Sequence, residues 1–271
     1  MTKWFHKCSL EWLKARQHYL TATDVKELLP VTKTGRKRSV GWENYMKVLA
    51  SKKVNLTEAD CVSTGAAARG HILEPYAIDR YNEEDFGGRW LFHWDDILIA
   101  KFVPFGLAFS PDALDKKSDS NVWIKDSEGN TNTTITVGSG PFGPNVLGEV
   151  KSYSPERHML CGYTPKGELE ERWQLATAMA VCDTIDEAFL LFYNPSMQDQ
   201  LYIVDYARTD LSNEIATVLE IEDNWLNWLD HLYQLDCNHY VQGNPEEEQA
   251  IIRGIMKSEE LNPEGMKSVI A

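Results

Sequence analysis

Two short segments contain carboxylates and an ammonium of the kind that carry out metal-assisted hydrolysis. The first ends at Asp112, and the second contains Glu149, Val150 and Lys151. Because successive side chains of a strand alternate between its faces, Glu149 and Lys151 should share one face while Val150 points into the core. If the strand that ends at Asp112 pairs beside them, two carboxylates and a lysine converge on one surface.

Such a surface suits a hard divalent cation with an activated water. Magnesium prefers oxygen ligands and keeps several waters, so Asp112, Glu149 and the backbone carbonyl of Val150 would suffice, and we expect Mn²⁺ to substitute. The metal would activate the water, while Lys151 would orient it and stabilise charge on a phosphate. This is the chemistry of phosphodiester hydrolysis. A surface ion pair uses the same residue types and is the alternative interpretation.

Capping signals and periodicity predict the elements that position these residues. Thr21 and Asp24 have the spacing of a capping box, which predicts a helix ending near Pro30. Two further helices are expected in the alanine-rich run 63–82 and in the run 168–182. Short runs rich in β-branched and aromatic residues predict five strands, at residues 96–103, 105–110, 146–153, 188–193 and 200–206.

The chain of 271 residues has no boundary sharp enough to divide it. We therefore expect a single α/β domain over residues 1–271, with a mixed central β-sheet flanked by helices. Residues 115–145 form an insertion in which two strand-like runs flank a turn, which predicts a β-hairpin. An acidic helix with an apolar stripe of leucine and tryptophan is expected within residues 209–243.

The distribution of charge indicates a DNA-facing side. The net charge of −14 would by itself disfavour a nucleic-acid partner, because phosphate binding needs a basic surface. Residues 1–60, however, carry twelve Lys or Arg against six Asp or Glu, whereas residues 209–248 carry ten acidic residues and no basic one. We expect the basic N-terminal part to face DNA. Its basic loop, which is either a DNA contact or a solvated loop, contains Lys33, Arg36, Lys37 and Arg38.

Other classes of protein are disfavoured. The longest apolar runs are far shorter than the roughly 20 residues of a membrane span. The N-terminus lacks the apolar stretch of a secretory signal, so a cytoplasmic location is expected. The five cysteines lie far apart without a C-x-x-C pair, which predicts reduced thiols rather than disulfides or a zinc site.

At the catalytic candidates the sequence resembles a known family. Asp112 followed by Glu149-Val150-Lys151 resembles the PD-(D/E)XK nuclease signature. Ser-Pro-Asp-Ala-Leu and Leu-Gly-Glu-Val-Lys resemble the lambda-type phage exonucleases, the YqaJ-like branch of that superfamily. The resemblance implies a restriction-endonuclease-like fold.

The flanking motifs of the family imply roles for four further residues. Arg16 and Thr23 match the motif in which an arginine and a hydroxyl hold the DNA 5′-phosphate. Glu74, in Ala-Arg-Gly-His-Ile-Leu-Glu, matches an acidic residue that a helix adds to the metal site. Gln174, in Trp-Gln-Leu-Ala-Thr-Ala-Met, matches a glutamine that supports the catalytic lysine.

Two features depart from the pattern of the family. The gap of 37 positions between Asp112 and Glu149 is longer than usual, because the expected hairpin intervenes. An inserted hairpin leaves the sheet register unchanged, so the two strands can still pair. Glu171 and Arg172 stand where tyrosines are common, which leaves the contacts of this helix open.

The resemblance implies a Mg²⁺-dependent 5′-to-3′ exonuclease on linear double-stranded DNA. Its product would be a 3′ single strand for a single-strand annealing protein in phage-type recombination. The resemblance also implies a homo-oligomer, a ring such as a trimer, in the cytoplasm of a bacterial host if the chain is phage-derived. Two alternatives stay open: a PD-(D/E)XK endonuclease of restriction or repair type, and a non-catalytic acidic DNA mimic or adaptor. The intact set of Asp112, Glu149 and Lys151 favours an enzyme.

Overall fold

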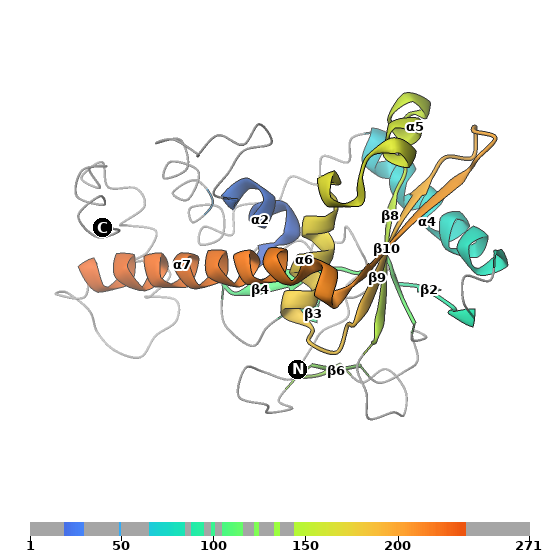
Figure 1. Ribbon diagram of the computed structural model, residues 1–271. Helices are drawn as coiled ribbons and strands as arrows, with labels where there is room; N and C mark the ends of the chain where they lie inside the picture. The colour runs from blue at the N-terminus through green and yellow to red at the C-terminus, as the bar shows by residue number, and fades with distance from the viewer. Residues whose placement is uncertain are drawn as a thin grey trace.

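A five-stranded mixed sheet forms the centre of the protein (Figure 1). The computed structural model describes residues 19–29, 49, 65–84, 88–94, 99–100, 105–115, 122–124, 133–135 and 144–236. The strands lie in the order β10-β9-β8-β5-β2. Only β8 and β9 are parallel, and the other pairs of this sheet are antiparallel. The five strands are β2 (Phe92–His93), β5 (Ala113–Leu114), β8 (Val146–Lys151), β9 (Glu187–Tyr193) and β10 (Leu201–Ala207).

Two smaller sheets accompany the central one. A three-stranded sheet has the order β1-β4-β3, with β1 parallel to β4. A two-stranded antiparallel sheet, β6 with β7, lies in the insertion where a hairpin was expected. The strands of these sheets are β1 (Leu20–Thr21), β3 (Ile99–Ala100), β4 (Leu107–Phe109), β6 (Val122–Ile124) and β7 (Thr133–Ile135).

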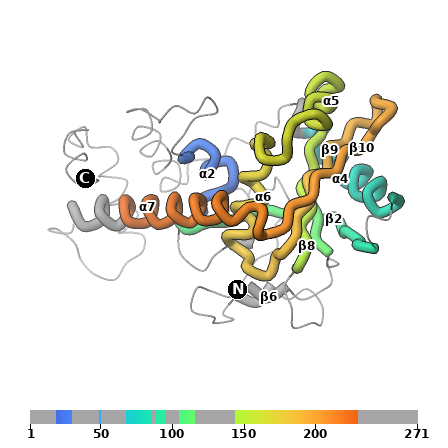
Figure 2. Tube along the Cα trace, in the orientation of Figure 1, coloured from blue at the N-terminus to red at the C-terminus, as the bar shows by residue number. Residues whose placement is uncertain are grey.

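Helices cover both faces of the central sheet, as the Cα trace in Figure 2 also shows. The helix α4 packs on one face and α6 on the other, and α7 packs against α6. The helices are α2 (Ala22–Leu28), α4 (Gly65–Glu83), α5 (Pro155–Tyr163), α6 (Arg172–Val181) and α7 (Ser212–Asp236), with short 3₁₀ turns η2 (Lys166–Glu168) and η3 (Arg208–Leu211). None of the helices in the described ranges combines the length and apolar character that crossing a membrane requires.

The two faces of β8 meet different helices, as its alternation predicts. Val146 and Val150 belong to a buried cluster with Tyr81 of α4. Leu147 belongs to the cluster that contains Leu175 of α6. The side chains at positions 149 and 151 therefore share the α6 face of the sheet.

The predicted capping box begins α2. Asp24 accepts hydrogen bonds of 2.9 Å from both the backbone N–H and the hydroxyl of Thr21. Val25 and Leu28 of the same helix are buried. The helix ends at Leu28, two residues before Pro30, which agrees with the expected boundary.

The acidic helix α7 fixes the chain that leads into β4. Glu222 accepts a 2.8 Å hydrogen bond from the backbone N–H of Leu107, and the indole of Trp225 donates to the carbonyl of Phe105. Phe105 has a φ of 63°, a left-handed conformation that a non-glycine residue adopts at a cost. These bonds hold the turn before β4, which runs on toward Asp112.

The helix α5 was not expected from the sequence. It begins at Pro155, with Ser154 at the N-cap, immediately after the strand that carries Glu149 and Lys151. Proline in the first turn after a serine is a helix-start signal. Cys161 of α5 and Cys182 are buried free thiols.

Candidate active site

Asp112 lies immediately before β5, so the expectation that it ends the preceding strand is wrong. The preceding strand, β4, pairs with β1 and β3, whereas Ala113 pairs with Gly148 of β8. The Oδ2 atom of Asp112 accepts a 2.9 Å hydrogen bond from the backbone N–H of Val150. The residue is only 6% exposed. Asp112 is therefore held beside the segment that carries the other candidates.

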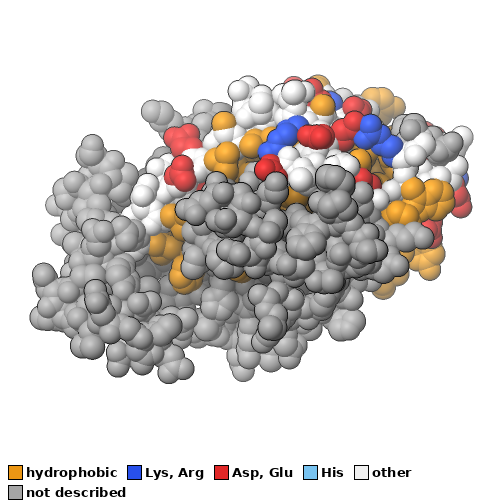
Figure 3. Space-filling model, turned by 90° about the horizontal axis from the view of Figure 1, so that it is seen from below, with side chains coloured by type: hydrophobic (Ala, Val, Ile, Leu, Met, Phe, Trp, Pro, Cys, Tyr) orange, Lys and Arg blue, Asp and Glu red, His pale blue; other side chains and the backbone are white. Residues whose placement is uncertain are grey.

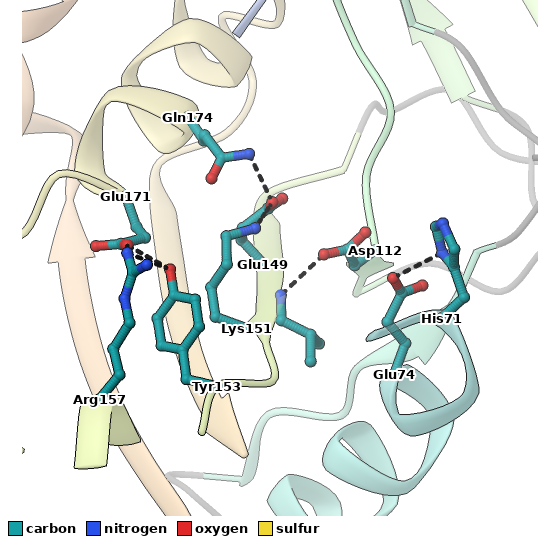
Figure 4. A network of polar contacts seen from close by, with 10 residues as sticks. His71, Glu74, Asp112, Glu149, Lys151, Tyr153, Arg157, Glu171 and Gln174 are labelled. Carbon is teal, nitrogen blue, oxygen red and sulfur yellow. Dashed lines mark hydrogen bonds and ion pairs between the residues drawn. The ribbon is translucent and has the colours of Figure 1, made fainter. Parts of the chain in front are cut away.

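Lys151 and Gln174 both contact Glu149 on the α6 side of the sheet (Figure 4). The Nζ atom of Lys151 contacts Oε1 of Glu149. The side-chain amide of Gln174, from α6, donates a 3.0 Å hydrogen bond to the same oxygen. Glu149 is 8% exposed, so its carboxylate is held by an ammonium and an amide in a largely buried position.

Glu74 approaches from α4, on the opposite face of the sheet. Its Oε1 lies 3.0 Å from Nδ1 of His71, and its Oε2 lies 3.5 Å from Nε2 of His93. In the view of Figure 4, Asp112 lies between Glu149 and Glu74. Sequence reasoning missed both histidines, although His71 stands at i−3 from Glu74 on the same helix, a spacing at which side chains meet.

Two of the three buried carboxylates suit a hard cation. Asp112, Glu149 and Glu74 are buried carboxylates from three neighbouring elements. In the described part of the chain, no three His, Cys, Asp or Glu side chains form a group that could hold a metal ion. Magnesium is usually held by one or two carboxylates together with several waters. Asp112 and Glu149 therefore fit the chemistry of Mg²⁺, with the carbonyl of Val150 as a further oxygen.

A second polar network adjoins the first, and sequence reasoning missed it. The hydroxyl of Tyr153 donates to the carboxylate of Glu171. Nη2 of Arg157 lies 3.2 Å from the same carboxylate and 3.3 Å from the Tyr153 hydroxyl. The backbone carbonyl of Glu171 accepts a 2.9 Å hydrogen bond from the N–H of Gln174. The two networks are thus joined at the start of α6.

Burial and hydrogen bonding fix the protonation of this network. Burial, with the hydrogen bond to Glu171, raises the pKa of Tyr153 far above its usual value. Burial alone would raise the pKa of Glu171, but the Tyr153 hydrogen bond and the charges of Lys26 and Arg157 lower it overall. Near neutral pH, Tyr153 is therefore a neutral donor and Glu171 an anion. Since Lys26 belongs to α2, that helix lies close to the network.

Most of the predicted DNA-binding residues lie outside the described residues. Thr23 is described: it is exposed in the first turn of α2, which packs against α6. Thr23 therefore lies at the surface of α2. The residues outside the described ranges are Arg16, Lys33, Arg36, Lys37 and Arg38.

Acidic and basic side chains are interspersed on the described surface seen in Figure 3.

The helix α7 covers residues 212–236 of the expected acidic segment, and residues 237–243 lie outside the described ranges. Glu220 and Asp223 of α7 are exposed. The acidic helix that the sequence indicated is therefore present, and part of its charge faces solvent.

Comparison with known proteins identifies the fold. No protein-family model and no curated protein sequence matches the chain. A crystal structure of LHK-Exo in complex with dAMP is similar, with 22% sequence identity and a TM-score of 0.51, over 84% of this chain and 100% of that chain. A crystal structure of the alkaline exonuclease LHK-Exo from Laribacter hongkongensis gives 21% identity, with the same TM-score and coverage. The chain therefore adopts the PD-(D/E)XK-like α/β fold that its sequence resemblance implied.

Proposed function

We propose that this chain is a Mg²⁺-dependent 5′-to-3′ exonuclease on linear double-stranded DNA. One observation carries the proposal: the N–H of Val150 holds Asp112 beside Glu149, whose carboxylate also contacts Lys151 and Gln174. LHK-Exo, which shares the fold, is an alkaline exonuclease, and its complex with dAMP supports a deoxynucleotide as the product. The 3′ single strand left behind would serve a single-strand annealing protein in recombination.

The metal site would use the buried carboxylates. Asp112 and Glu149 would hold Mg²⁺ or Mn²⁺, with Glu74 and the Val150 carbonyl assisting, and the ion would supply a Lewis acid and a more acidic bound water. The hydrogen bond from Val150 orients Asp112 before any ligand binds. Such preorganisation lowers the cost of assembling the site during the reaction.

Lys151 and Gln174 both contact the Glu149 carboxylate and would have different roles. The ammonium of Lys151 stands on the same strand face as Glu149, where it would orient the attacking water and stabilise charge that develops on the phosphate. Gln174 keeps the Glu149 carboxylate in position through its 3.0 Å hydrogen bond. Lys151 would thus be a catalytic residue, and Gln174 a positioning residue.

DNA binding would use the basic N-terminal part of the chain. Arg16 and Thr23 would hold the 5′-phosphate, and the 33–38 loop would contact the DNA backbone. Thr23 is exposed on α2. The charge of Lys26, in the same helix, lowers the pKa of Glu171 near the catalytic strand. This proximity supports a 5′ end that lies close to the scissile bond.

End-labelled linear duplex, incubated with Mg²⁺ or with EDTA, tests the proposal. A 5′-to-3′ exonuclease releases a 5′ label at once as a short product, whereas a 3′ label stays in long fragments that shorten with time. Covalently closed circles distinguish the endonuclease alternative, which would linearise them. Absence of Mg²⁺-dependent hydrolysis on every substrate would favour a non-catalytic protein instead.

A further inference from the structure

Arg157 lies in the first turn of α5, directly after the strand that carries the catalytic candidates. The helix α5 begins at Pro155, four positions after Lys151. The guanidinium carbon lies 3.9 Å from the ring centroid of Tyr153, and Nη2 contacts both the Tyr153 hydroxyl and Glu171. One face of the guanidinium and its Nη2 atom are therefore in contact with the protein.

Part of the guanidinium is available to a ligand. The Arg157 side chain is 55% exposed, whereas that of Glu171 is 6% exposed. Among the described residues, Nε and Nη1 of Arg157 have no hydrogen-bond partner. The N–H groups on these two nitrogens can each donate a charge-assisted hydrogen bond to a phosphate oxygen.

Tyr153 and Glu171 make this arginine rigid. A free arginine side chain loses much rotamer freedom when it binds, and stacking on the Tyr153 ring has already removed most of that freedom. Because Tyr153 is neutral and Glu171 ionised near neutral pH, both contacts of Nη2 persist under ordinary conditions. Tyr153 and Glu171 therefore hold the Arg157 guanidinium in one orientation.

Tyr153 and Arg157 also lie on the catalytic side of the sheet. Tyr153 packs against the core cluster that contains Leu147 of β8 and Leu175 of α6, so it lies on the same face as Glu149 and Lys151. In Figure 4, Tyr153 and Arg157 lie on the Lys151 side of the site, away from Glu74. A phosphate bound at Arg157 would thus neighbour the phosphate at Lys151.

We infer that Arg157 binds a backbone phosphate of the DNA strand next to the scissile phosphate, with Tyr153 and Glu171 as its positioning residues. The inference rests on the proposed function, because it assumes that DNA occupies the site. It adds a DNA contact from α5, a helix that the sequence did not predict, to those expected from residues 1–60.

Salt-dependent DNA binding tests this contact without catalysis. Fluorescence anisotropy of a 5′-phosphorylated duplex, in EDTA at several NaCl concentrations, gives the slope of log K against log salt. Loss of one phosphate contact should reduce the slope by about 0.9. Arg157→Ala should show this change and about tenfold weaker binding at low salt. Arg157→Lys should keep the slope but lose part of the affinity, because it keeps the charge and loses the planar edge.

The positioning role of Tyr153 is tested by whether its effect on DNA binding adds to that of Arg157. Tyr153→Phe keeps the stacked ring but removes the hydroxyl, so it should weaken binding by less than Arg157→Ala does and leave the slope unchanged. The double variant should bind no more weakly than Arg157→Ala alone, because the hydroxyl acts through the arginine. Arg80→Ala is the matched control, since Arg80 is also an exposed arginine paired with glutamates, on α4. Arg157→Gln gives the same measurement if the alanine variant unfolds.

The possible outcomes separate this inference from the proposed function. If the unmodified chain binds and cleaves DNA while Arg157→Ala keeps its affinity and slope, the inference is wrong and the proposed function stands. If the double variant binds more weakly than Arg157→Ala, the positioning role of Tyr153 is wrong. If the unmodified chain neither binds nor hydrolyses DNA, the proposed function fails first.

Discussion

The carboxylate of Asp112 accepts a hydrogen bond from the backbone N–H of Val150, 38 positions later in the chain. Because Val150 lies between Glu149 and Lys151, this bond fixes Asp112 relative to both. The pairing of Ala113 with Gly148 sets the same register. Among the described strands, β6 and β7 of the insertion pair only with each other, so the long gap leaves the register of the central sheet unchanged.

Gly148→Ala should disturb this register. A Cβ at position 148 would lie 2.9 Å from Cδ1 of Leu91 and 3.1 Å from the Cβ of Ala113, both of which are buried. We expect the free energy of unfolding to fall by about 1–3 kcal/mol, and nuclease activity to fall as Asp112 shifts with β5. Urea denaturation measures the first effect. Gly167→Ala is the control, because a Cβ there would have no atom within 4 Å. Equal stability of the two variants would contradict the close contact.

The 5′ end of the substrate should affect the rate. If Arg16 and Thr23 hold the 5′-phosphate, the unmodified chain should digest 5′-phosphorylated duplex faster than 5′-hydroxyl duplex. Arg16→Ala and Thr23→Val should reduce the difference, because each removes a donor to the phosphate. Thr209→Val, at another exposed threonine, should leave the difference intact. Equal initial rates on both ends by the unmodified chain would rule out this role.

A ring that encloses DNA should spare closed circles. Such a ring can load only at an end, so linear duplex should be degraded processively while covalently closed circles survive. Light scattering should give a mass that is a multiple of the 30.9 kDa chain, because a closed assembly needs several copies. A monomer in solution and on DNA, or rapid linearisation of circles, would favour the endonuclease alternative.

Glu171 should make the stability of the protein depend on acidic pH. Burial by itself would raise the pKa of Glu171. The hydrogen bond from Tyr153 and the charges of Lys26 and Arg157 outweigh it and lower this pKa in the folded protein. Below about pH 4.3, the ordinary glutamate value, the unfolded chain takes up this proton first. The free energy of unfolding therefore falls until the folded carboxyl is protonated as well. Urea denaturation between pH 7 and 3 should show a smaller fall for Glu171→Gln, and equal falls would exclude this contribution.

Local patterns predicted the parts of the site that one element determines. The shared face of Glu149 and Lys151 follows from the two-residue period of a strand. The start of α2 follows from the spacing of Thr21 and Asp24, since a capping box is a contact within one turn. The fold itself followed from a resemblance that the structural comparison confirms.

Contacts between elements were harder to predict. Asp112 was placed at the end of a strand, but β4 ends at Phe109. Pro111 has no N–H for a ladder, so the chain leaves one sheet there and enters the next at β5. The Arg157 network depends on how α5 and α6 pack, which no local period specifies. Only the Ser154-Pro155 pair indicated that a helix begins there.

Asp112, Glu149 and Lys151 are proposed to form the site of hydrolysis. The most direct measurement compares the Mg²⁺-dependent release of label from 5′-labelled linear duplex by the unmodified chain and by Glu149→Gln. We predict a loss of at least about 10²-fold, because a metal ligand contributes several kcal/mol to the transition state. Asp112→Asn and Lys151→Ala should lose activity to a similar degree, with Lys151→Ala still binding DNA. The exposed-site control Asp183→Asn should stay active. Substantial turnover by Glu149→Gln would show that the metal site lies elsewhere.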